Sequence, residues 1–272
     1  MTPFSALLLG ILEGLTEFLP VSSTGHLVLL GERLGYHDDA AKTLEITIQL
    51  GAILAVVVYY RDVLAKLARG VWARDPAKLR LLGALAIAFT PAAVLGLALH
   101  RFIKSALMAP GPIALALIAG GVVMAAVDGW ARKRAPGSGE PDRGFDDVTP
   151  KRALVVGLCQ CLSLWPGTSR SMTTILGGQL AGLRTSTAAE FSFLLSIPVL
   201  GAATALDLVK DGPALLATSD GRTALLVGMA TAFVVSLAVI SAFLRYLKRF
   251  GLVPFGVYRI ALGVLVLATA PS

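Results

Sequence analysis

Residues 13–26 carry the side chains of this chain that are best suited to chemistry, between two apolar runs. The stretch reads Glu-Gly-Leu-Thr-Glu-Phe-Leu-Pro-Val-Ser-Ser-Thr-Gly-His. A charged group in apolar surroundings is costly unless it is paired or neutralised. Glu13 and Glu17 are four residues apart, so on a helix they share one face and repel each other. The pair therefore predicts a shared cation, which is either a metal ion or an arginine from elsewhere in the chain.

The second half of this stretch predicts a broken helix with hydroxyl groups at the break. Pro20 ends the first helix because it removes a backbone donor. Ser22, Ser23 and Thr24 then stand where a new helix begins, and the free N–H groups of a helix start bind anions. Ser23 could act as a nucleophile, and His26 could take its proton. The alternative is structural: the hydroxyls cap the new helix and His26 forms a hydrogen bond at its end.

A second broken segment, residues 165–174, reads Trp-Pro-Gly-Thr-Ser-Arg-Ser-Met-Thr-Thr. Arg170 lies inside an apolar region and needs an anionic partner. Its planar guanidinium can hold a phosphate group through two parallel hydrogen bonds. Ser169, Ser171 and Thr174 are further candidates for phosphate contacts, with helix capping as the alternative for the serines. The other interpretation of Arg170 is an internal ion pair with Glu13, Glu17, Glu45 or Glu190.

The composition indicates an integral membrane protein. Hydrophobic residues make up 56% of the chain, charged residues make up 15%, and the mean hydropathy is +0.76. Soluble domains carry about 25% charged residues. Helices satisfy their own backbone groups in lipid, so the predicted fold class is all-α. The net charge of +7 is attributed to basic cytoplasmic loops, and no nucleic-acid partner is expected.

The hydropathy pattern predicts six membrane spans and two re-entrant helical hairpins. Each hairpin consists of two short apolar pieces. The first hairpin has pieces at 3–18 and 26–35, and the second has one at 153–165 and another that ends at residue 182. These pieces are too short for a hydrocarbon core that needs roughly 20 helical residues. Pro91 is expected to kink its span. The spans are expected at about 44–60, 81–100, 112–130, 187–207, 223–244 and 254–270.

The pattern of the first half recurs in the second. Pro20 and the hydroxyls after it correspond to Pro166 and the hydroxyls after that residue, and the surroundings of Glu45 correspond to those of Glu190. These two glutamates are interpreted as buried polar contacts at the repeat interface. A hairpin followed by three spans inverts the second half relative to the first, as in many transporters. The prediction is one membrane domain, 1–272, with inverted repeats 1–130 and 153–272 joined by a cytoplasmic linker, 131–152.

The loop charges predict the orientation. Loops 61–80, 131–152 and 245–252 share one side and hold 15 Lys and Arg residues, against 6 in the loops of the other side. The basic side is expected to be cytoplasmic. Both termini would then lie outside, and the first hairpin would open to the external face.

Both motifs resemble those of the undecaprenyl-diphosphate phosphatases of the bacitracin-resistance type. Glu13 and Glu17 match the Glu-x-x-x-Glu of that family, and Pro166 to Thr174 match its Pro-Gly-x-Ser-Arg-Ser-x-x-Thr. The resemblance extends over essentially the whole chain. It implies a multi-pass enzyme of the bacterial inner membrane that hydrolyses undecaprenyl diphosphate to undecaprenyl phosphate and phosphate. That reaction recycles the lipid carrier of peptidoglycan synthesis, and it confers bacitracin resistance because bacitracin traps the diphosphate.

The resemblance also implies roles for individual residues. Glu13 and Glu17 would hold a divalent cation, Mg²⁺ or Ca²⁺, which neutralises the diphosphate. Ser23 would attack the terminal phosphorus and His26 would take its proton; the alternative is attack by a metal-bound water, with Ser23 only binding. Glu17 and the guanidinium of Arg170 would complete the set of catalytic groups. Phosphate contacts are assigned to Arg170, Ser22, Thr24, Ser169, Ser171 and Thr174.

Two other classes of function compete with hydrolysis. A transporter or polyprenyl-phosphate flippase would also use inverted repeats, but it has no need of a Ser23 and His26 pair. A membrane scaffold would leave the charges inside the membrane unexplained. A homodimer is left open as a possible assembly.

Overall fold

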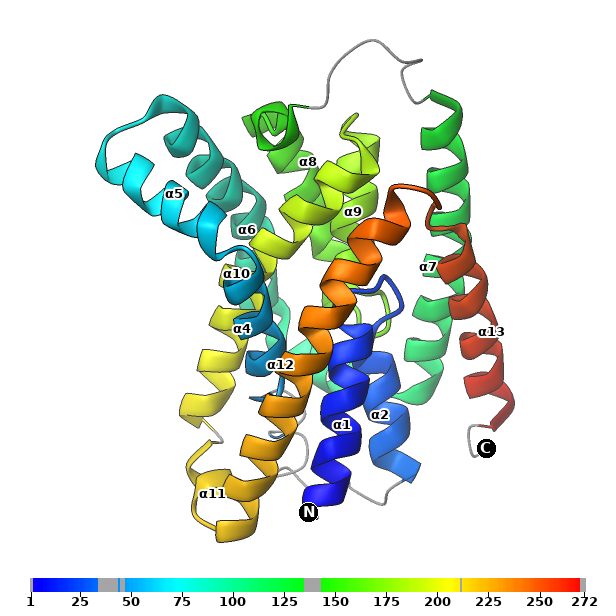
Figure 1. The fold of residues 1–272 in the computed structure, drawn as a ribbon. Helices are drawn as coiled ribbons and strands as arrows, with labels where there is room; N and C mark the ends of the chain where they lie inside the picture. The colour runs from blue at the N-terminus through cyan, green and yellow to red at the C-terminus, as the bar shows by residue number, and fades with distance from the viewer. Residues whose placement is uncertain (1, 34–43, 45–46, 135–142, 211, 270–272) are drawn as a thin grey trace.

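The computed structural model describes residues 2–33, 44, 47–134, 143–210 and 212–269, and every regular element in these ranges is a helix. The long helices run side by side along one direction (Figure 1). The start of α1 and the end of α13 lie at the lower end of this view, whereas α5 lies at the upper end. The all-α prediction is confirmed, and mostly apolar helices are what a chain must form to satisfy its backbone in lipid.

Four helices are long and apolar enough to cross a membrane, and they contain the spans predicted at 81–100, 112–130, 187–207 and 223–244. Pro91 lies within one of them, which continues past it. These four helices are α6 (Pro76–Phe102), α7 (Pro110–Arg134), α10 (Thr185–Lys210) and α12 (Ser219–Leu247).

The other two predicted spans form shorter apolar helices. Helix α4 (Gln49–Tyr59) has 11 residues and α13 (Val253–Thr269) has 17. A helix rises about 1.5 Å per residue, so neither reaches the roughly 30 Å of a hydrocarbon core. Residues 45–46, at the start of the first predicted span, lie outside the described residues.

Each half of the chain begins with one broken helix, which consists of two short helices joined by a turn. The first consists of α1 (Pro3–Thr16) and α2 (Ser23–Arg33). The second consists of α8 (Pro150–Gln160), the 3-10 turn η3 (Cys161–Leu164) and α9 (Arg170–Leu180). Figure 1 shows α1 and α2 at the lower end and α8 and α9 at the upper end, with the two connecting turns close together at mid-height.

Each broken helix starts at a threonine cap followed by proline. The hydroxyl of Thr2 accepts from the N–H of Ser5, and the hydroxyl of Thr149 accepts from the N–H of Arg152. A capping hydroxyl satisfies one of the free N–H groups of a helix start, and proline at the first helical position loses nothing because its missing N–H would be unpaired.

Glycines set each broken helix close against a long helix from the other half of the chain. A Cβ built on Gly10 of α1 would lie 2.5 Å from the carbonyl oxygen of Gly228 in α12. A Cβ built on Gly157 of α8 would lie 2.7 Å from the carbonyl oxygen of Ala88 in α6. Any larger residue would force the helices apart, so these glycines position the hairpins.

Two predicted loops are helical instead. The segment predicted as loop 61–80 forms α5 (Arg61–Trp72) and the start of α6. Leu67 is buried, and Val63, Leu64 and Val71 pack beside it against the core, so α5 has an apolar face that stabilises it as a helix. The loop predicted around residues 101–104 is also wrong, because α6 continues into the π-helical turn η1 (Ile103–Leu107).

Helices also extend into the predicted linker. The predicted linker 131–152 includes the end of α7 and the start of α8, and residues 135–142 lie outside the described ranges. The described residues also form two small helices, the 3-10 turn η2 (Gly144–Asp147) and α11 (Gly212–Leu216).

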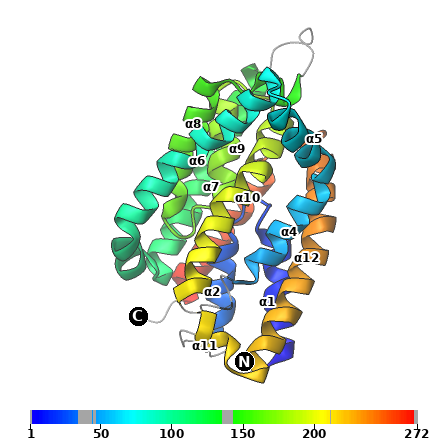
Figure 2. The same ribbon diagram turned by 90° about the vertical axis from the view of Figure 1, so that its left-hand side faces the viewer.

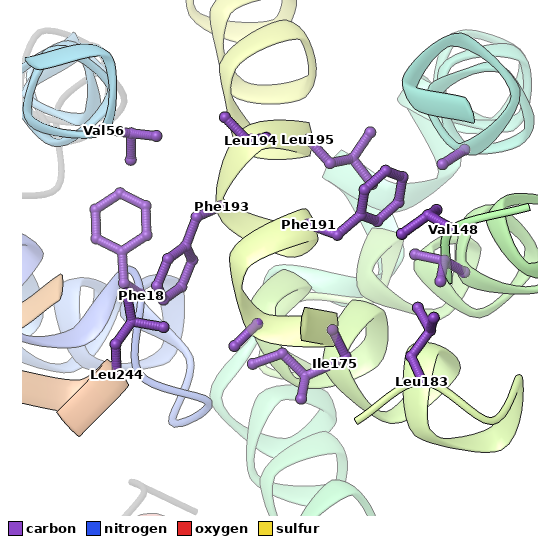
Figure 3. Packing of buried hydrophobic residues seen from close by; sticks show 14 of the residues in the cluster. Phe18, Val56, Val148, Ile175, Leu183, Phe191, Phe193, Leu194, Leu195 and Leu244 are labelled. Carbon is purple, nitrogen blue, oxygen red and sulfur yellow. The ribbon is translucent and has the colours of Figure 1, made fainter. Parts of the chain in front are cut away.

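The core holds the turn after α1 against the middle of α10. Helix α4 lies between α10 and α12 (Figure 2). The fully buried Phe18, which follows α1, meets Phe193 of α10 edge-on with ring centroids 5.2 Å apart (Figure 3). Val56 and Leu244 lie around this pair. An aromatic pair of this geometry stabilises the fold beyond its buried area, and it anchors the residue next to Glu17.

Candidate active site

The two turns at mid-height have the same unusual backbone. Ser22 has φ of 72° and Ser169 has φ of 75°, a region that non-glycine residues rarely occupy. Each serine precedes a helix and caps it: the hydroxyl of Ser22 accepts from the N–H of Gly25, and that of Ser169 accepts from the N–H of Met172, both at 3.3 Å. The capping alternative therefore describes what Ser22 and Ser169 do in this structure, and strain of this kind clusters at functional sites.

Glu17 joins the two turns. Its Oε1 accepts from Nη2 of Arg170 at 2.7 Å, and its Oε2 accepts from the hydroxyl of Ser23 at 2.5 Å. The side chains of Arg170 and Glu17 are only 8% and 5% exposed. Glu17 is thus the anionic partner that Arg170 requires, and the two predicted motifs, 153 residues apart at this contact, form one site.

The other side of the Arg170 guanidinium faces α10. Its Nη1 donates to the backbone carbonyl of Ser192 at 3.2 Å. The hydroxyls of Ser192 and Thr174 lie 2.6 Å apart, and Thr174 also donates to the carbonyl of Arg170. The Nε of Arg170 has no hydrogen-bond partner among the described residues. Ser192 was missed by the sequence reasoning, because a serine in a long apolar span gives no signal of its own.

Ser171 ties the two turns together, and its predicted contact with substrate stays a prediction. Its hydroxyl donates to the backbone carbonyl of Leu19 at 2.9 Å and lies 3.0 Å from the hydroxyl of Ser169. Thr24 is half-buried at the start of α2, beside the capped N-terminus. Of the hydroxyls predicted to bind substrate, Thr24 alone makes no contact that fixes either turn in the described structure.

His26 is held by two partners, neither of which is Ser23. Its Nδ1 lies 2.7 Å from the carbonyl oxygen of Ser22, and its Nε2 lies 2.7 Å from the hydroxyl of Tyr258 in α13. A carbonyl only accepts, so Nδ1 carries a proton, and in the neutral ring Nε2 accepts from Tyr258. The role of His26 as the base for Ser23 stays a prediction. Tyr258 was also missed, and it stands in the predicted span nearest the C-terminus.

Glu13 lies one helical turn before Glu17 and is completely buried. The N–H of Glu17 donates to the carbonyl of Glu13 at 2.9 Å, which keeps both residues in one continuous turn. Carboxylate oxygens are the ligands that Mg²⁺ and Ca²⁺ prefer. Among the described residues, no third His, Cys, Asp or Glu side chain joins them in a cluster. The two carboxylates therefore match the ligand preference of a hard cation.

Two further glutamates, Glu45 and Glu190, were singled out in the sequence. Glu45 lies outside the described residues, and Glu190 is half-buried in α10, two residues before Ser192. Their interpretation as contacts at a repeat interface stays a prediction.

Comparison with known proteins gives a consistent family. Residues 6–265 match the family model described as bacitracin resistance protein BacA. A protein of Sorangium cellulosum is 63% identical over 264 residues, which is 97% of this chain and 85% of that protein. One from Nitrosomonas europaea is 47% identical over 98% of this chain and 94% of its own length. One from a Thermoanaerobacter species is 45% identical over 96% and 94%. All three are named undecaprenyl-diphosphatase.

Proposed function

The chain belongs to the bacitracin resistance protein BacA family, and from this we propose that it hydrolyses undecaprenyl diphosphate to undecaprenyl phosphate and phosphate. The enzyme is a multi-pass membrane protein, and its product is the lipid carrier used again in peptidoglycan synthesis. The observation that carries the mechanism is the Glu17 carboxylate, which holds the hydroxyl of Ser23 and the guanidinium of Arg170 in one buried site. A transporter or flippase is not favoured, since the relatives are named for hydrolysis.

We assign Ser23 as the nucleophile. Its oxygen would form a bond to the terminal phosphorus while the anhydride P–O bond breaks and undecaprenyl phosphate leaves. Water would then cleave the serine phosphate and release inorganic phosphate. Since Ser23 donates to Glu17, the carboxylate of Glu17 is the group placed to receive the proton. His26 stays a candidate base, and it would first have to release Tyr258 or Ser22.

Arg170 would stabilise the negative charge that spreads over the transferred phosphoryl group. Its Nε has no partner among the described residues, so the guanidinium keeps a donor for phosphate while Glu17 and Ser192 orient it. The free N–H groups at the start of α2, and the hydroxyl of Thr24, provide further contacts for an anion. Attack by a metal-bound water is the competing route.

A divalent cation, Mg²⁺ or Ca²⁺, would be held by Glu13 and Glu17. It would neutralise charge on the diphosphate and so make the terminal phosphorus easier to attack. Within this chain, Glu13 of α1 and Glu17, which caps the end of that helix, would supply the oxygen ligands, while Glu17 also pairs with Arg170.

The metal assignment predicts the behaviour of a Glu13→Ala variant. Phosphate release should fall to a few per cent or less, because a cation ligand is lost, and the response to added Mg²⁺ should become weaker. Phosphate release would be measured over a Mg²⁺ titration after EDTA treatment. The control variant is Ser196→Ala, which also removes a buried polar group but one whose hydroxyl donates to the carbonyl of Phe193 in the same helix. An unchanged metal response would remove Glu13 from the cation site.

We propose that the fold is an inverted repeat, each half consisting of a re-entrant hairpin and three spanning helices. The support comes from equivalent residues with equivalent roles, since each pair below is separated by the same 147 positions. The pairs are the helix caps Thr2 and Thr149, the close-packing glycines Gly10 and Gly157, and the strained serines Ser22 and Ser169. A homodimer in the inner membrane is a separate proposal, which the residue pairs above do not support.

The orientation is tested by thiol labelling of intact cells in a Cys159→Ser, Cys161→Ser background. Lys66 of α5 and Arg222 of α12 are both exposed, and Figure 1 places these parts of the molecule at opposite ends. With the basic side in the cytoplasm, Lys66→Cys should resist an impermeant maleimide and Arg222→Cys should react. The reverse pattern would invert the topology and would place the termini and the opening of the first hairpin in the cytoplasm.

The activity itself is tested with purified protein in detergent. Phosphate release from a long-chain polyprenyl diphosphate should be rapid with Mg²⁺, should fall on addition of EDTA, and should be absent from Ser23→Ala protein prepared in parallel. A wild-type protein that is folded, loaded with Mg²⁺ and still releases no phosphate would overturn the proposed reaction.

A further inference from the structure

Arg259 is a fully buried arginine in the middle of the apolar helix α13. A charge at this depth is costly and usually marks a functional element. Among the described residues, no carboxylate lies within ion-pair distance of it. Its guanidinium donates instead to three backbone carbonyls, which come from three different parts of the chain.

Two of these carbonyls belong to the turns that form the active site. Nη1 donates to the carbonyl of Pro20 at 3.3 Å, and Nη2 donates to the carbonyl of Gly167 at 2.9 Å. The third, at 3.1 Å from Nη2, is that of Ala116 in α7. Pro20 and Gly167 each lie two residues before the serine with positive φ. When the turns are aligned on these serines, rather than on Pro20 and Pro166, one side chain holds equivalent points of the two turns.

The carbonyls that Arg259 holds are close in sequence to the reacting groups. Pro20 precedes Ser23 by three residues, and Gly167 precedes Arg170 by three. In each turn, a serine with positive φ lies between the carbonyl that Arg259 binds and the functional residue. A short backbone segment with an unusual conformation therefore connects the two. A shift of either carbonyl would therefore move Ser23 or Arg170 relative to Glu17.

Gly120 of α7 makes the space for this guanidinium. A Cβ at position 120 would collide with Nη2 of Arg259 and lie 3.2 Å from the sulfur of Met172, near the start of α9. A side chain at position 120 would therefore displace the guanidinium of Arg259 from its present place.

We propose that Arg259 is a positioning residue that clamps the two turns together and so fixes Ser23 and Arg170 on either side of Glu17. It does not touch the substrate. The inference rests on the proposed phosphatase function, but the clamp itself concerns only the distance between the two hairpins.

The test combines kinetics with a distance measurement on the full-length protein. Arg259→Met keeps the length of the side chain and removes the donors. Misplacing reacting groups by about 1 Å can cost roughly 10² in rate, so kcat should fall about 10²-fold with KM little changed. Arg259→Lys has one ammonium that cannot replace the planar two-sided grip, so it should recover only a small part of kcat. Arg222→Met, which alters an exposed arginine that bonds to the carbonyl of Leu216, is the control.

Spin labels report the clamp independently of activity. Labels on Leu15→Cys and Leu162→Cys, at exposed positions near the two turns, would be compared by electron paramagnetic resonance in the Cys159→Ser, Cys161→Ser background. A narrow distance distribution in the parent should broaden in Arg259→Met. Gly120→Ala, which keeps the arginine but crowds it, should broaden the distribution as well.

The outcomes separate the clamp from the alternatives. A lower melting temperature with parental kcat per folded molecule and a parental distance distribution would make Arg259 merely structural and overturn the proposal. If Arg259→Met does not fold, Arg259→Lys decides: parental kcat and distribution in that variant would also overturn it. If the wild-type protein releases no phosphate, the proposed function fails, while the spin-label comparison still tests the clamp.

Discussion

Replacing Arg170 by alanine should lower phosphate release by at least about 10³-fold, the scale on which arginines that stabilise a transferring phosphoryl group act. Its guanidinium pairs with Glu17, and its Nε has no hydrogen-bond partner within the described parts of the chain. Arg170→Lys keeps the charge but loses the planar fork, so it should also fail badly. Phosphate release and substrate affinity would be measured on both variants, and both should decrease.

Stability separates catalysis from a structural ion pair. Removing one partner of a buried pair costs about 3–5 kcal/mol, so Arg170→Ala should also melt at a lower temperature. A purely structural arginine would be largely rescued by lysine in both stability and activity. A stable and active Arg170→Lys protein would remove Arg170 from the catalytic set. Arg222→Ala, which alters an exposed guanidinium bonded to a backbone carbonyl, should behave as wild type.

Ser23→Ala should reduce turnover by at least roughly 10³-fold if Ser23 is the nucleophile, because the covalent route is then lost. The variant removes one oxygen that bonds to Glu17 and leaves the ion pair with Arg170 in place. Its melting temperature should therefore change little compared with its activity. Single-turnover assays with a polyprenyl diphosphate labelled in the terminal phosphate should give no labelled protein, whereas wild-type protein quenched in acid should carry label.

Ser22→Ala provides the comparison. Ser22 is also buried, but its hydroxyl caps α2, and loss of a cap costs about 1 kcal/mol of stability. Turnover should therefore fall much less than in Ser23→Ala. Retention of a tenth or more of wild-type turnover by Ser23→Ala would shift the mechanism to a metal-bound water.

The sequence by itself determined the class of the molecule and predicted many residues of its candidate site. Hydropathy and charge predicted an all-helical membrane protein, because long apolar helices leave a strong local signal. The unusual polar runs around Glu17 and Arg170 were visible because charges and prolines are rare in apolar segments. Local pattern also indicated that the two halves begin alike, and the caps and glycines of both hairpins agree with it.

The tertiary structure decided how the candidate groups pair. The sequence left Arg170 with four possible carboxylate partners and left Ser23 with His26, and the structure places Arg170 and Ser23 on the two oxygens of Glu17. It places His26 against Tyr258, from the far end of the chain. Such pairings depend on which helices meet, and side-chain hydrogen bonds act over only about 3 Å.

Arg259 is a second residue whose partners the sequence could not predict. One charge inside the last predicted span was a visible signal, since a buried arginine must find partners. Its partners are backbone carbonyls of Pro20, Ala116 and Gly167, which every residue possesses and which no sequence pattern distinguishes. The residue types therefore predicted groups suited to phosphate chemistry, and only the tertiary structure decided which of them meet, because the contacts of Glu17 and Arg259 join residues far apart in the sequence.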